Sequence, residues 1–158
     1  MYAAIVRRKV RRVFDEINAG NYWAMVESLG EPFEYHFHGD HALGGRRTSV
    51  DAMNRWWARL MRLLPDARFE VLDVLVRGWP WRTRVAVRAR VTGDLPGGER
   101  YENTVFQSMT LVGGRVTSVD TVCEPAPRPS SLGTANGPQL GVRLPQRNGA
   151  FEVKSGGN

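Results

Sequence analysis

The chain has 158 residues and a mass of 17.7 kDa, enough for one domain that buries about two thirds of its surface on folding. With 42% hydrophobic residues, 24% charged residues and a net charge of +6, its composition is typical of a globular protein, and no apolar run approaches the ~18 residues of a membrane helix. No secretory signal is visible, so we expect a cytoplasmic protein without a membrane partner. The single cysteine, Cys123, excludes an intrachain disulfide and a cysteine zinc site.

Residues 3–18 are predicted to form a helix, because apolar side chains recur at steps of three and four from Ile5 to Ile17. Gly20 follows this helix and suits a left-handed C-cap. The same segment contains the densest basic run of the chain, residues 7–12. We interpret that run as a solvated helix face and therefore expect no nucleic-acid partner.

A shorter helix is predicted over residues 22–29, ending at the break Gly30-Glu31-Pro32. The following segment, residues 33–38, alternates with period two and is predicted to be a strand. A polar, glycine-containing loop then extends to Arg47, after which Thr48 or Ser49 is expected to cap a third helix. That helix is predicted to continue to Leu64, because Pro65 ends it.

The second half of the domain is predicted to be all strand, with glycine-rich turns between four segments at residues 67–78, 82–93, 100–112 and 115–123. The resulting order of elements, ααβαββββ, is typical of an α+β fold. We expect the helices to pack on one face of a curved antiparallel sheet.

The composition changes at about Pro125. Residues 125–158 contain five of the nine prolines and few apolar side chains. They also carry half of the net charge, from Arg128, Arg143, Arg147 and Lys154 against Glu152. We therefore predict a folded domain over residues 1–124 and a tail over residues 125–158 that is disordered or loosely packed.

Four short motifs recur in an order that suggests a known fold. They are residues 17–21 at the end of the first helix, the glycine-rich loop before the third, residues 64–71 after it, and residues 113–116 before the last strand. Over roughly residues 5–123 the chain resembles the NTF2-like superfamily, in its SnoaL-like and ketosteroid-isomerase-like branch. The resemblance implies a cone of bent sheet around three helices with a deep apolar pocket, and commonly a homodimer through the outer sheet face. It does not specify an activity, because this fold hosts many.

The densest set of titratable side chains lies at residues 36–41, which contain all three histidines of the chain. On a strand, His36 and His38 share one face, and Asp40 joins them if the strand continues. Such a set suits acid–base chemistry near neutral pH. The resemblance favours Asp40 as the general base, because it stands thirteen residues before Met53, as the carboxylate of ketosteroid isomerases does before an apolar helix residue. His38 and His36 are then the proton-shuttling candidates, and His41 is a further one.

Two other interpretations of this segment remain open. The histidines could face solvent on an edge strand, with Asp40 and His41 only forming the next turn. A His-x-His-x-Asp set could also hold a metal ion, since alternate strand residues project together. No fourth ligand can be read from the sequence, so our prediction includes no metal and no cofactor.

Several residues are predicted to line the pocket. Tyr101, Asn103, Gln107 and Met109 share one strand face, and Trp56 would suit a flat apolar ligand. The resemblance implies that the oxyanion-binding tyrosine and the protonated aspartic acid of ketosteroid isomerases are replaced here by Val13 and Gln107.

Three weaker candidates come from the later strands. In limonene-epoxide hydrolases the strand that corresponds to residues 82–93 contributes an arginine and an aspartate to the pocket. The resemblance places Arg88 at the position of the arginine, whereas Arg90 stands at the position of the aspartate. Asp120 or Glu124 would be the last-strand acid of SnoaL-like cyclases. The register of that strand is open, and a slip of one residue reverses the face.

The sequence leaves two functions open. One is a cofactor-independent isomerase, cyclase or dehydratase that uses Asp40, His38 and His36 on an apolar carbonyl substrate. The other is a non-catalytic module that binds a ligand or dimerises with the same fold. A position of these three side chains outside any cavity would favour the second function.

Overall fold

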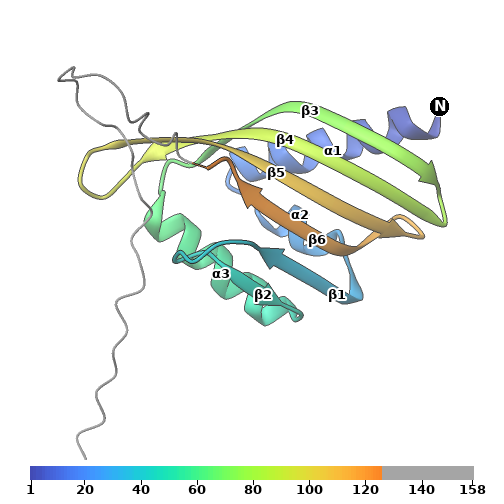
Figure 1. Cartoon of the computed structure of the whole chain (residues 1–158), viewed down its shortest axis with the longest axis horizontal. Coiled ribbons are helices and arrows are strands. Elements are labelled where there is room, and N and C mark those ends of the chain that lie inside the picture. The colour runs from blue at the N-terminus through green and yellow to red at the C-terminus, as the bar shows by residue number, and fades with distance from the viewer. Residues whose placement is uncertain (126–158) are drawn as a thin grey trace, which may run out of the picture.

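Three helices and six strands make up the described part of the chain, residues 1–125 (Figure 1). The computed structural model contains the helices α1 (Tyr2–Asn18), α2 (Trp23–Glu27) and α3 (Val50–Leu63). The strands are β1 (Leu29–Phe37), β2 (Gly45–Arg47), β3 (Arg68–Trp79), β4 (Arg82–Asp94), β5 (Arg100–Val112) and β6 (Arg115–Cys123). The tail predicted at residues 125–158 lies, apart from Pro125, outside the described residues.

The six strands form one curved sheet in the order β2-β1-β6-β5-β4-β3 (Figure 1). Neighbouring strands run antiparallel, except that β1 runs parallel to β6. Because β1 comes early in the chain and β6 comes last, this pair joins the two halves of the domain. We call the sheet face toward the helices the inner face and the opposite one the outer face. The predicted α+β fold, with helices against one face of a curved sheet, is confirmed.

The structure differs from the sequence prediction around β1. The predicted helix over residues 22–29 ends at Glu27, and β1 begins at Leu29 rather than at Phe33. Its early start depends on a distant partner, because the Ser28 carbonyl accepts a hydrogen bond from the Val116 amide at 2.9 Å. The short strand β2 was predicted as loop, because Gly45-Arg46-Arg47 shows no apolar alternation. It forms by pairing with residues 35–37 of β1.

The local signals at the helix ends are confirmed. Ser49 caps α3 by accepting a hydrogen bond from the Ala52 amide at 3.2 Å. Gly20, just beyond α1, has a φ of 94° and so provides the left-handed turn that ends the helix. Within residues 1–125, none of the helices is both long and apolar enough to cross a membrane.

Strand β4 shows why the core forms on the inner face. Its side chains alternate strictly, so that Val85, Val87 and Ala89 are buried and the arginines between them are exposed. In Figure 1, α1 and α2 lie behind the sheet. The apolar side of α1, with Val6 and Phe14, is buried there.

A polar contact fastens α1 to β3, which is an edge strand. The Asn18 side chain donates to the Phe69 carbonyl and accepts from the Phe69 amide, both at 2.8 Å. These two backbone groups face away from β4 at the free edge of the sheet, so Asn18 satisfies hydrogen bonds that no strand provides.

Replacing Asn18 should therefore destabilise the fold. Asn18→Ala is expected to lower the free energy of unfolding by ~1–3 kcal/mol, because it leaves a partly buried amide and carbonyl without partners. Urea unfolding followed by circular dichroism measures this change. The control Asn21→Ala removes only an exposed contact with Glu16 and should cost less than about 0.5 kcal/mol. Equal effects of the two substitutions would contradict the role of Asn18.

Candidate functional site

An apolar cavity of about 260 Å³ lies between α1 and the inner face of the sheet. Most of its wall comes from α1, β5 and β6, with Trp56 and Trp57 of α3 completing it. Among the lining residues are Val6, Val10, Val13, Phe14, Ile17, Met25, Leu29, Phe69, Met109, Leu111, Val116 and Val119. A cavity of this size and lining suits a small, mostly apolar molecule.

From the sheet, Tyr35 of β1 and Gln107 of β5 bring polar side chains to this cavity. Between them lies Thr121 of β6, whose hydroxyl donates to the Tyr35 hydroxyl oxygen at 3.5 Å. Thr121 also pairs in register with Gln107, so their side chains are neighbours on one face. The three residues form a short polar row in an otherwise apolar interior.

Burial strengthens the preference of Tyr35 for its neutral form. The residue is 1% exposed, and this loss of hydration raises the pKa of its phenol well above the ordinary value of 10.0. The Thr121 hydrogen bond and the positive charge of Arg47 lower the pKa, but by less than burial raises it. The phenol therefore stays protonated at neutral pH. It can donate a hydrogen bond to a ligand oxygen in the cavity.

A second cavity of about 40 Å³ shares the walls Tyr35, Trp56, Phe69 and Gln107 with the larger one. Tyr101 and Cys123 line it on the far side, and burial raises the pKa of the Cys123 thiol. Among the described residues that line these two cavities, none carries a carboxylate or an imidazole. The interior offers hydrogen-bond donors but no ordinary general base.

The larger cavity reaches the surface at the N-terminal half of α1. Ile5, which is 60% exposed, lines it together with Lys9 and Gly114. The Lys9 ammonium donates to the Gly114 carbonyl at 3.4 Å, so its side chain joins α1 to the β5–β6 turn at this opening.

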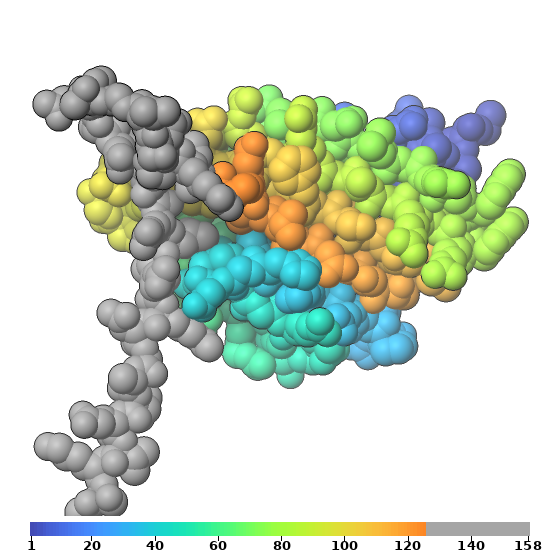
Figure 2. All heavy atoms as spheres, in the orientation of Figure 1, coloured from blue at the N-terminus to red at the C-terminus, as the bar shows by residue number. Residues whose placement is uncertain are grey.

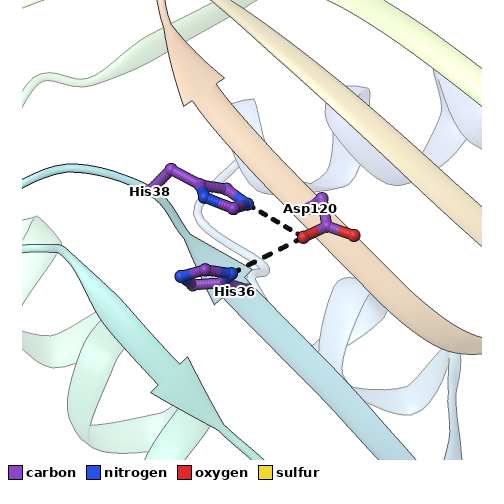
Figure 3. A group of neighbouring side chains, drawn as sticks. All are labelled: His36, His38 and Asp120. Carbon is purple, nitrogen blue, oxygen red and sulfur yellow. Dashed lines mark hydrogen bonds and ion pairs between the residues drawn. The ribbon is translucent and has the colours of Figure 1, made fainter.

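His36 and His38 lie on the outer face, away from both cavities. Phe33, Tyr35 and Phe37 are the buried side of β1, so His36 and His38 point outward as the alternation requires. His36 pairs in register with Asp120 of the parallel strand β6. The His38 Nε2 to Asp120 Oδ1 distance is 2.9 Å and the His36 Nδ1 to Asp120 Oδ1 distance is 3.6 Å (Figure 3).

Four other residues that the sequence suggested as site residues are not part of the cluster of His36, His38 and Asp120. Asp40 is exposed in the turn after β1. His41 packs edge-on against the Phe37 ring, and its Nε2 lies 3.1 Å from the His38 carbonyl oxygen. Arg88 is exposed on the outer face. Glu124, also exposed, donates its backbone amide to the Thr104 carbonyl.

The predicted pocket residues are divided between the cavities. Trp56, Gln107 and Met109 line the larger cavity, and Tyr101 lines the smaller one. Asn103 lines neither of them, and its side-chain oxygen accepts a hydrogen bond from the Thr104 amide at 2.8 Å. Tyr35 was missed as a site residue. The alternation of residues 33–38 was the signal available, since it places Tyr35 opposite the histidines.

Comparison with known proteins identifies the family. Residues 10–119 match the model of the SnoaL-like domain, and the chain belongs to this family. No match was found among curated proteins.

Several solved structures share the fold. Bal32a, from a soil-derived mobile gene cassette, has 21% identity and a TM-score of 0.66, covering 78% of this chain and 92% of that one. A protein assigned as a SnoaL-like polyketide cyclase in Jannaschia sp. CCS1 has 22% identity, a TM-score of 0.63 and coverages of 77% and 87%. A protein with a ketosteroid isomerase-like fold from Catenulispora acidiphila, in complex with trimethylamine, has 17% identity, a TM-score of 0.60 and coverages of 72% and 82%.

The raised pKa of Tyr35 predicts a loss of stability at alkaline pH. Above pH ~10 the unfolded chain loses the Tyr35 proton while the folded chain keeps it, so stability falls by up to about 1.4 kcal/mol per pH unit. Tyr35→Phe removes this contribution. Between pH 9 and pH 11, the free energy of unfolding measured in urea should fall by ~1 kcal/mol less in the variant than in the wild type. Equal declines would contradict the buried, protonated phenol.

Proposed function

We propose that the protein binds a small, mostly apolar molecule with one carbonyl oxygen in the cavity beneath α1. The observation that carries this proposal is the pairing of an apolar lining with the protonated Tyr35 hydroxyl and the Gln107 amide. The apolar wall favours hydrocarbon surface, and the two donors select an oxygen acceptor over hydrocarbon alone. Trp56 and Trp57 offer flat ring faces to such a ligand.

The position of the acid–base candidates supports binding over catalysis. Enolisation of a bound ketone needs a base within hydrogen-bond reach of the α-proton, directly or through one water. His36 and His38 point to the outer side of the sheet and Asp40 is exposed in the turn after β1, whereas Tyr35 of β1 points inward. Their assignment as the catalytic residues of an isomerase, cyclase or dehydratase stays a prediction from the sequence.

The probe 1-tetralone and its hydrocarbon counterpart tetralin test the proposed binding, because they differ only in the carbonyl. In equilibrium dialysis the wild type should bind tetralone about threefold to tenfold more tightly than tetralin, the value of one neutral hydrogen bond. Tyr35→Phe should reduce that preference, because only the Gln107 amide remains as a donor. Val10→Phe should weaken the binding of both ligands by filling the cavity. The matched controls are Tyr101→Phe, in the smaller cavity, and Val122→Phe, on the outer face. No binding of either ligand by the wild type would refute the proposal for this ligand class.

The same samples discriminate binding from catalysis. Proton NMR of tetralone in D₂O follows exchange of its α-protons, the step that a general base would accelerate. A binding module leaves the exchange rate at that of buffer. Exchange accelerated by the wild type and lost in Asp40→Asn would instead establish the enzyme, with Asp40 as its base.

We also infer that two copies of the chain pair through the outer sheet face, as the resemblance implies. Phe106 of β5 and Val122 of β6 are opposite each other there, and each remains about 40% exposed in the single chain. Phe106→Glu should give a monomer in light scattering, while Phe106→Leu keeps the dimer. A monomeric wild type would contradict this inference. Location in the cytoplasm stays a prediction from the sequence.

A further inference from the structure

The cluster on the outer face of β1 and β6 consists of two imidazoles and one carboxylate, His36, His38 and Asp120 (Figure 3). One ligand-type atom from each residue lies within 4.8 Å of the other two. The two distances to Asp120 Oδ1, 2.9 and 3.6 Å, bracket the roughly 3.3 Å between neighbouring ligand atoms of a tetrahedral ion with bonds of about 2.0–2.1 Å. Small side-chain rotations would therefore suffice to surround an ion.

The sheet holds these side chains in register. His36 and Asp120 are directly paired across the parallel strands, and His38 follows two residues later on the same face. The His38 amide donates to the Thr121 carbonyl at 2.8 Å, which keeps the chain beside β6 beyond the end of β1. The His36 and His38 rings lie 3.6 Å apart between centroids. Rigid strands rather than a loop thus set two of the three ligand positions.

The charges around the cluster are compatible with a cation. The Asp120 carboxylate supplies a negative charge, and two neutral imidazoles supply lone pairs. Arg46, which pairs with His36 on β2, is the nearest cation in the sheet register, but its guanidinium is bound to the Glu34 carboxylate at 3.2 Å. On the other side of Asp120, strand β5 offers the neutral Ser108.

We propose that His36 Nδ1, His38 Nε2 and Asp120 Oδ1 hold a divalent transition-metal ion, with Zn²⁺ as the test case. In the single chain the side chains are 20%, 45% and 51% exposed, so a fourth position faces water there, as in open rather than structural zinc sites. In Figure 2 the atoms of β1 and β6 meet at the surface seen in that view. This site is separate from the cavity, since it lies on the opposite face of β1, and it departs from the sequence prediction of no metal.

The sequence contains few other histidine or cysteine side chains that could compete for a metal ion. All three histidines and the only cysteine of the chain lie within the domain, and the tail contains neither residue type. His41 is the one imidazole outside the cluster, so His41→Ala controls for histidine binding in general. Asp66, an exposed carboxylate in the turn after α3, gives the control Asp66→Asn for the loss of a negative charge.

The experiment is a Zn²⁺ titration of the full chain after treatment with EDTA, by calorimetry. The wild type should bind one ion per chain, and His38→Ala and Asp120→Asn should each weaken binding at least about tenfold. The two controls should stay within about twofold of the wild type, and thermal unfolding without metal verifies that all variants are folded. Absence of saturable binding, or equal affinity in Asp120→Asn and Asp66→Asn, would overturn the site.

The visible spectrum of bound Co²⁺ provides a second measurement, which reports the coordination geometry of the ion rather than its affinity. Co²⁺ bound to the wild type should show the intense visible d–d bands of a four-coordinate ion, and Asp120→Asn should abolish them. Bands that persist in Asp120→Asn would contradict the assignment of this carboxylate. Val10→Phe, which fills the cavity, should keep wild-type Zn²⁺ affinity, so failure of the ligand proposal and failure of the metal proposal are distinguishable.

Discussion

The parallel pairing of β1 with β6 is the constraint on which the rest of this structure depends. It joins the first strand of the chain to the last and so makes one continuous curved sheet, behind which α1 packs. The period of two along β1 then decides which side chains go inward and which go outward. A shift of the register by one residue would exchange the positions of Tyr35 and His36.

This single strand separates two kinds of chemistry. Its inner side carries Tyr35, a neutral phenol whose pKa is raised further by burial. Its outer side carries His36 and His38, which keep contact with solvent and with Asp120. Hydrogen-bond donors therefore face the apolar cavity, while the imidazoles and the Asp120 carboxylate face away from it.

Local patterns in the sequence were sufficient for most of the fold. The apolar stripe of residues 3–18 gave α1, Ser49 began α3, and the alternation of residues 82–93 placed the valines of β4 in the core. Strand β2 and the start of β1 could not be predicted, because Gly45-Arg46-Arg47 and Gly30-Glu31-Pro32 carry no strand signal. β2 becomes a strand by pairing with residues 35–37 of β1, and the start of β1 becomes one by pairing with β6, which is distant in sequence.

The sequence by itself determined that His36 and His38 share one face of a strand and that Tyr35 lies on the other. It also determined the pocket-facing side of β5, because alternation is a local property of the backbone. Only the tertiary structure decided which face of β1 is buried, since aromatic and imidazole side chains both occur in cavities. It also replaced Asp40 by Asp120 as the carboxylate beside the histidines. That contact joins residues more than eighty positions apart, and no periodicity within a strand specifies its partner strand or their register.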